Sequence, residues 1–179
     1  VLNAKAPYGA LLAITALGQM LVIMTGGIDL SVPGTFTLAA MIMAGVTDGS
    51  DSLIGVALLT AIGVAALIGL VNGLLIGGLK LNPLIVTLAV GQVVIGLVNR
   101  YGRTFPVQSQ VPPGLSEWTS TRILGLSPVF WAGAILTVLL IIAFRYTAAG
   151  RRFQVVGANP VASRVVGVRV NLNQIGAYV

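Results

Sequence analysis

Long stretches without any charged residue dominate the pattern along this chain. They cover residues 6–28, 30–47, 52–79, 81–99 and 123–144. A helix needs roughly 20 residues to cross the hydrocarbon core of a membrane, and only the second stretch is clearly shorter. Their apolar character is continuous rather than alternating, which favours helices over the strands of a membrane β-barrel. The pattern predicts membrane spans at about 6–25, 34–47, 53–79, 83–100 and 126–145.

These spans predict an all-α fold, a polytopic membrane helix bundle that forms one domain over residues 1–179, and the composition agrees. Only 8% of the residues are charged and 56% are hydrophobic, whereas soluble domains carry roughly 25% charged residues. The net charge is +6, but the basic residues lie between the apolar stretches, a pattern that indicates membrane orientation rather than nucleic-acid binding. The chain has no His and no Cys, so neither a metal site nor a hydrolytic centre is expected.

The basic residues are unevenly distributed. Residues 145–170 contain five Arg and no acidic residue, so the positive-inside rule places this segment in the cytoplasm. Counting spans back from it puts Lys80 and residues 26–33 on the inner side, with Asp51 and the loop 100–122 outside. Six basic residues then lie inside and four outside, which supports the same orientation.

The first two apolar stretches are separated by a single charged residue, Asp29. An ionised Asp in the middle of a spanning helix costs about 2.5–3.5 kcal/mol on insertion scales. Gly26 and Gly27 can end one helix, because glycine tolerates a left-handed backbone, and Asp29 or Ser31 can cap the next. The pattern therefore predicts a broken helix with a polar tip near 26–34.

Two interpretations of this break remain open from spacing alone. Transporters place broken helices beside the substrate path, where a helix N-terminus meets polar groups. Alternatively, residues 26–34 form a plain interfacial turn between two spans, with Asp29 in contact with water.

Small and polar side chains also interrupt the later spans. Glycines spaced by four mark one helix face at Gly69, Gly73 and Gly77, which favours close helix packing over a ligand groove. Polar side chains occur at Asn72, Thr87 and Gln92. They can contact a transported substrate or form helix–helix hydrogen bonds of about 0.6 kcal/mol each.

The basic segment at about 146–172 contains signals for a short helix. We expect Gly157 to end one helix, Asn159 to cap the next, Pro160 to occupy its first position and Gly167 to close it after about two turns. Such a compact helix can dock into a groove of a partner as a rigid body. Alternatively, the segment is a basic loop that contacts anionic lipid headgroups.

Three stretches together resemble the ribose/xylose/galactose-type permeases of bacterial ABC importers, in the wider family that includes branched-chain amino-acid permeases. Gly26 to Val32 matches the Gly-Gly-Ile-Asp-Leu-Ser-Val signature, although Pro33 stands where the family usually has Gly. Asn72 to Leu88 matches a second motif. The third match involves Gly157, Asn159, Ala162, Gly167, Val168 and Val170.

The resemblance implies a permease subunit that translocates a monosaccharide and performs no bond chemistry itself. It implies no cofactor bound by this chain, since ATP and Mg are used by a partner ATPase. The implied partners are ABC ATPase subunits, a periplasmic sugar-binding protein and a second permease copy, all at the bacterial inner membrane, with lipid around the spans. It also implies that these residues are a fragment of a longer permease.

The resemblance and the pattern together give two sets of candidate residues, with no catalytic residue and no metal ligand. The candidates for the translocation path are Gly26, Gly27, Asp29, Ser31, Asn72, Thr87 and Gln92. The candidates for coupling to the ATPase, which the family contacts through this segment, are Gly157, Asn159, Pro160, Ala162, Arg164 and Gly167.

Three alternatives differ in substrate or class. An ABC permease for branched-chain amino acids or for a sugar-like signal molecule would keep the mechanism and change the cargo. An ion-coupled secondary transporter would need buried ionisable groups, for which only Asp29 is available. An intramembrane hydrolase would need a base to activate its nucleophile, and the chain has no His or paired carboxylates for that role.

Overall fold

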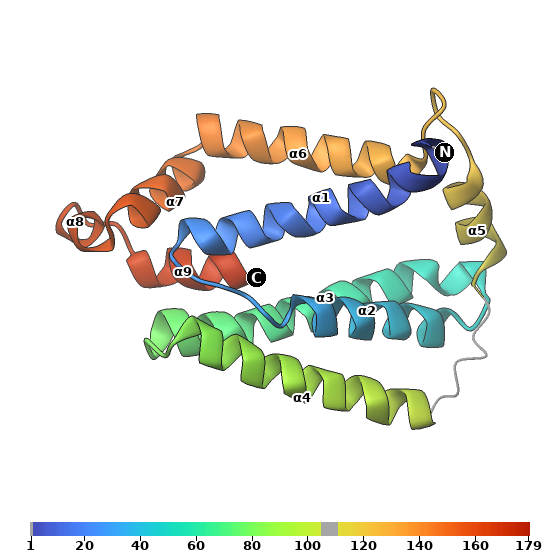
Figure 1. Ribbon diagram of the computed structural model, residues 1–179, viewed down its shortest axis with the longest axis horizontal. Helices are drawn as coiled ribbons and strands as arrows, with labels where there is room; N and C mark the ends of the chain where they lie inside the picture. The colour runs from blue at the N-terminus through green and yellow to red at the C-terminus, as the bar shows by residue number, and fades with distance from the viewer. Residues whose placement is uncertain (1, 105–110) are drawn as a thin grey trace.

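The computed structural model describes residues 2–104 and 111–179, and this part of the chain is built from helices (Figure 1). The long helices are α1 (Leu2–Met24), α2 (Val32–Thr47), α3 (Ile54–Gly73), α4 (Pro83–Thr104) and α6 (Pro128–Tyr146). The short ones are η1 (Asp51–Leu53), the π-helical turn η2 (Leu74–Gly78), α5 (Pro113–Ser120), α7 (Ala148–Ala158), α8 (Pro160–Val165) and α9 (Val170–Tyr178). The predicted all-α class is confirmed.

Four helical segments are long and apolar enough to cross a membrane. They are Pro7–Met24, Asp51–Gly78, Pro83–Gly102 and Pro128–Tyr146, and the shorter α2 is also apolar. Many of their large side chains point outward, as Leu59 does with 73% of its surface exposed. Outward apolar side chains are what a lipid environment favours. The chain is therefore a multi-pass membrane helix bundle.

The helices form two groups that α9 joins. Figure 1 shows α1 beside α6 in one group and α2, α3 and α4 in the other, and α9 contacts both α1 and α3. The second group encloses an apolar core of Leu38, Ile42, Ala61 and Val94. The predicted break at 26–34 is therefore the connection between the two groups.

The two ends of the bundle differ in charge, as the orientation argument expected. One end carries the turn at Lys80 together with α7 and α8 (Figure 1). There Lys80 Nζ donates to Asn171 Oδ1 at 2.6 Å and to Gln174 Oε1 at 3.0 Å. Partial burial, and then the positive charge of nearby Arg164, lower the pKa of Lys80. At the other end, the Gly114 amide donates to Asp51 Oδ1 at 2.9 Å.

The glycine face of α3 and η2 packs directly against α9. A Cβ atom added at Gly69 would lie 2.0 Å from the Tyr178 carbonyl oxygen, and one at Gly73 would lie 2.8 Å from the Ile175 carbonyl oxygen. Real Cβ atoms do not approach other atoms so closely. The close-packing interpretation of these glycines is confirmed.

One glycine has a different role from the one expected. Gly157 does not end a helix, because α7 continues to Ala158 and stops only at the extended Asn159 (φ −157°) before Pro160. A residue that precedes proline avoids the helical region, which explains the stop. A Cβ added at Gly157 would lie 2.0 Å from the Met24 carbonyl oxygen. Gly157 thus allows α7 to rest on the C-terminal end of α1.

Changing Gly69 to Ala should separate α9 from α3, because the new methyl group has no space beside the Tyr178 carbonyl. We expect the full-length protein to lose about 1–3 kcal/mol of stability, as in other overpacked sites, measured by thermal unfolding in detergent. Gly63→Ala is the matched control, since nothing lies within 4 Å of a Cβ there. Equal stability of the two variants would contradict the packing described here.

The two ends of the bundle should lie on opposite sides of the membrane. Ser120 in α5 and Val165 in α8 are both exposed, and residues 1–179 contain no Cys. A Cys at Ser120 should react with an impermeant maleimide added to intact cells, whereas a Cys at Val165 should react only once the inner face is opened. The reverse labelling pattern would invert the orientation.

Candidate functional site

The site begins where α1 ends. The Gly26 amide donates to the Ile23 carbonyl at 2.9 Å and the Gly27 amide donates to the Val22 carbonyl at 3.0 Å, and Gly26 has φ +80°. This is the Schellman arrangement, in which a left-handed residue ends a helix. Residues 27–31 lie outside any helix and lead back along the bundle to the start of α2 at Val32 (Figure 1).

A chain of buried hydrogen bonds holds the start of α2. Asp29 Oδ1 accepts hydrogen bonds from the Ser31 amide at 2.8 Å and from Ser31 Oγ at 2.6 Å. Ser31 Oγ in turn accepts from Asn72 Nδ2 of α3 at 2.9 Å. Asp29 is 8% exposed, and the other two are almost completely buried. The Asp29 carboxylate therefore holds Ser31, the residue before the first turn of α2, and lies near the positive end of the helix dipole, which favours an anion.

This geometry tests one part of the interfacial-turn interpretation, the contact of Asp29 with water. Asp29 is buried, and Ser31 beside it lies next to Asn72, six residues before the end of the apolar segment Asp51–Gly78. The expectation of a solvated Asp29 is therefore wrong, whereas the role of the break in a substrate path remains a prediction.

Carbonyl groups of residues 27–31 also have partners from neighbouring helices. Gln19 Nε2 of α1 donates to the Asp29 carbonyl. Thr87 Oγ1 of α4, which is completely buried, lies 3.3 Å from the Ile28 carbonyl and 2.8 Å from the Pro83 carbonyl. The break is thus bonded to α1, α3 and α4, which satisfies polar backbone groups that water cannot reach.

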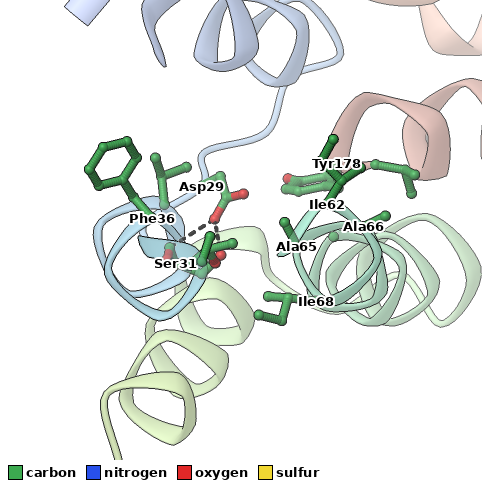
Figure 2. A pocket seen from close by; sticks show the side chains of 13 residues that line it. Asp29, Ser31, Phe36, Ile62, Ala65, Ala66, Ile68 and Tyr178 are labelled. Carbon is green, nitrogen blue, oxygen red and sulfur yellow. Dashed lines mark hydrogen bonds between the residues drawn. The ribbon is translucent and has the colours of Figure 1, made fainter. Parts of the chain in front are cut away.

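Two cavities meet at Asp29. One, of about 370 Å³, lies between α2, α3 and α9, with Asp29 and Ser31 at its polar end and Phe36, Ile62 and Tyr178 among its walls (Figure 2). The other, of about 270 Å³, lies between α1, α2 and α9 and also includes Asp29 and Tyr178. Neither cavity is lined by a Lys or Arg.

Two buried polar atoms at this site have no hydrogen-bond partner among the described residues, Asn72 Oδ1 and Tyr178 Oη. An unsatisfied buried polar group costs about 1–3 kcal/mol, so such atoms mark positions where water or a polar ligand can bind. The atoms come from α3 and α9. They extend the polar surface beyond Asp29 and Ser31.

Most of the predicted path residues come together here, and one does not. Gly26, Gly27, Asp29, Ser31, Asn72 and Thr87 all lie at or beside the break. Gln92 is exposed on another face of α4. Sequence reasoning missed Gln19 and Tyr178. Gln19 is a polar residue within an apolar stretch and could have been found, whereas nothing local in the sequence indicates that Tyr178 reaches Gly27. Among the described residues, no three metal-binding side chains come together.

The second set of candidates forms a rigid knob at the basic end. Asn159 Oδ1 accepts from the Val161 and Ala162 amides, both at 3.0 Å. Pro160 opens α8, and Gly167 (φ +80°) follows its end. Buried Ser163 donates to the Val155 and Asn159 carbonyls, which ties α8 to α7.

The outer surface of this knob is apolar. Val161, Val165 and Val166 are strongly exposed, with Val165 at 84%, and Ala162 and Arg164 are exposed beside them. Exposed valines on a short, capped helix are unusual for a surface that contacts only water. The local structure expected for α8 is confirmed, and its role in coupling remains a prediction.

Comparison with known proteins places these features in a family. The sequence model described as branched-chain amino acid transport system / permease component matches residues 5–179. The galactofuranose transporter permease YtfT of Escherichia coli is 36% identical over 184 residues, which cover 100% of this chain and 51% of that protein. The probable ABC transporter permease y4mJ of Sinorhizobium fredii is 34% identical over 177 residues, 96% of this chain and 51% of that protein.

A third relative, the fructose import permease FrcC of Rhizobium meliloti, is 32% identical over 176 residues, 94% of this chain and 49% of that protein. The chain thus spans about half the length of the curated relatives it matches. No solved structure matches it. The resemblance drawn from the three motifs is confirmed, and the chain belongs to the family of permease components of branched-chain amino acid transport systems.

Proposed function

We propose that this chain is part of the membrane-spanning permease subunit of an ABC importer, which carries a monosaccharide across the bacterial inner membrane. The observation that supports this most is the buried polar break at Asp29 and Ser31, which adjoins two cavities inside an apolar bundle. Relatives named as fructose and galactofuranose permeases support a sugar as the cargo.

The chemistry around the break suits a neutral polyhydroxylated substrate. Sugar hydroxyl groups both donate and accept hydrogen bonds, so they can pair with the Asp29 carboxylate and with the unpartnered Asn72 Oδ1 and Tyr178 Oη. The apolar walls of the larger cavity leave few other polar partners. Brief, weak pairing of this kind lets a substrate pass rather than remain bound.

The same surroundings favour a sugar over a branched-chain amino acid. An amino acid carries a carboxylate, which the Asp29 carboxylate beside the start of α2 would repel. No Lys or Arg lines either cavity to compensate. A sugar-like signal molecule has the same hydroxyl chemistry and stays a second candidate, whereas an ion-coupled transporter would use Asp29 itself as the coupling group.

In the proposed importer, the permease performs no bond chemistry and binds no cofactor. A periplasmic sugar-binding protein delivers the substrate at the outer end, a second permease copy completes the path, and ABC ATPase subunits use ATP and Mg at the inner end. The α8 knob is the docking element for the ATPase, because its exposed valines need an apolar partner surface. A movement of α8 is passed to the break through α7, because Gly157 of α7 packs against Met24, the last residue of α1.

Removing the charge at the break tests the path. Asp29→Asn should lower ATP-dependent sugar uptake by about tenfold or more, because one lost charge-assisted hydrogen bond is worth roughly 1.5–3 kcal/mol. Uptake is measured in proteoliposomes that contain the full-length permease, its ATPase and its binding protein. Asp48→Asn is the control, since Asp48 is exposed at the outer end of α2 in a left-handed conformation that Asn accepts well. Normal uptake by Asp29→Asn, with normal amounts of folded protein, would exclude Asp29 from the path.

A bulky residue on the knob tests coupling. Ala162→Trp keeps the charge of α8 but should prevent docking, so sugar-stimulated ATP hydrolysis by the reconstituted complex should fall several-fold. Arg152→Gln with Arg169→Gln removes two charges that lie outside α8 and should leave hydrolysis nearly unchanged. If Ala162→Trp is silent while the double variant loses coupling, the segment acts through its charge and not as a docked helix.

A further inference from the structure

We propose that the groove between α1, α6 and α7 binds an anionic phospholipid from the cytoplasmic leaflet. The groove has a volume of about 760 Å³ and lies apart from the two cavities at Asp29. Its walls are apolar along most of its length, Thr137 lies at one end, and Arg145, Arg151 and Gln154 lie at the other. The proposal does not depend on which substrate the permease transports.

The apolar part of the groove has the shape that an acyl chain needs. Leu17 and Met20 of α1 face Leu140, Ile141 and Phe144 of α6 across it. From Arg145 to Thr137 the groove follows eight residues of α6, a length of about 12 Å at about 1.5 Å per residue. The bilayer hydrocarbon itself is expected along these helices, so an acyl chain is the natural occupant.

The basic end of the groove lies where a phosphate group is expected. Arg145 is in the last turn of α6, the predicted inner end of the span, next to the exposed Tyr146. Tyr side chains of this kind favour the level of the lipid headgroups. Arg151 lines the same end of the groove as Arg145, because the chain turns sharply after Thr147 at the start of α7. Gly150 makes this corner possible, since a Cβ there would lie 2.3 Å from the Phe144 Cα atom.

Nothing in residues 118–179 can neutralise these two arginines. The last acidic residue of the sequence is Glu117, which lies in α5 at the opposite end of the bundle (Figure 1). Arg151 donates one hydrogen bond to the Tyr146 carbonyl at 3.3 Å, and Arg145 lies over the Tyr146 ring at 5.8 Å. Each guanidinium has five N–H donors. Most of them remain for a phosphodiester, which an arginine pair binds well.

The two arginines and the apolar shape of the groove together therefore favour an anionic phospholipid as its occupant. A zwitterionic lipid would bring its own cation to two arginines, whereas an anionic phospholipid supplies the missing negative charge and fills the apolar groove with its chain. Basic pockets between spans on the cytoplasmic side bind anionic headgroups in this way. A second protein helix could cover the apolar part but would leave the charges unpaired unless it carried acidic groups.

The test is native mass spectrometry of the full-length permease released from bilayers that contain equal amounts of phosphatidylglycerol and phosphatidylcholine. We expect retained phosphatidylglycerol in preference to phosphatidylcholine. The double variant Arg145→Gln with Arg151→Gln should lower the retained phosphatidylglycerol about 25-fold, because each basic residue near an anionic surface contributes roughly fivefold. The matched control is Arg152→Gln with Arg164→Gln, which removes the same charge outside the groove and should retain the lipid.

Leu140→Trp fills the groove without changing its charge, so it should also lose the lipid. Added inorganic phosphate should not displace the lipid if the acyl chain is seated. The proposal would be overturned by equal retention of the two lipids, by equal loss in the control variant, or by full retention in Leu140→Trp. Equal retention would indicate apolar binding without charge selection, equal loss in the control would indicate summed surface charge, and full retention in Leu140→Trp would indicate a headgroup contact without a groove. A groove covered by other helices of the permease would give no retained lipid and would also overturn it.

Discussion

A chain that breaks a helix inside a membrane must find partners for each amide and carbonyl group that the break exposes. Here the break between α1 and α2 meets that constraint with side chains from several helices. The carboxylate of Asp29 accepts a hydrogen bond from the Ser31 amide. The side chain of Gln19 donates to the Asp29 carbonyl, and that of Thr87 donates to the Ile28 carbonyl. Because these partners come from α1 and α4, the break also fixes how the two groups of helices meet.

Glycines supply the close contacts that hold this arrangement together. In membranes the hydrophobic effect does not drive helices toward each other, so close backbone packing provides much of the attraction. α9 lies against the glycine face of α3 and η2, and this contact places Tyr178 beside the break. α7 rests on α1 through Gly157, and its corner with α6 depends on Gly150. The same residue type thus positions both the polar site and the basic end.

The contacts described above form a short route between the two candidate regions, the break and the knob α8. The knob α8 is tied to α7 by Ser163, and α7 contacts the last residue of α1 just before the break. In the proposed importer, a displacement of α8 by the ATPase would therefore act on the C-terminal end of α1, where the Schellman turn begins. The apolar groove opens beside this same junction, so a lipid seated there would contact α1 and α7, two of the helices that form the route.

The sequence by itself determined the features that depend on neighbouring residues. Uncharged stretches predicted the helices, Gly26 the end of α1, and Asn159, Pro160 and Gly167 the limits of α8, because caps and breaks are set within a few residues of the chain. Only the tertiary structure decided which side chains meet. It buried Asp29, joined Ser31 to Asn72, left Gln92 exposed, and turned Gly157 from an expected helix end into a contact with Met24. These outcomes depend on how helices distant in sequence pack against each other, and no local pattern of residues specifies that packing.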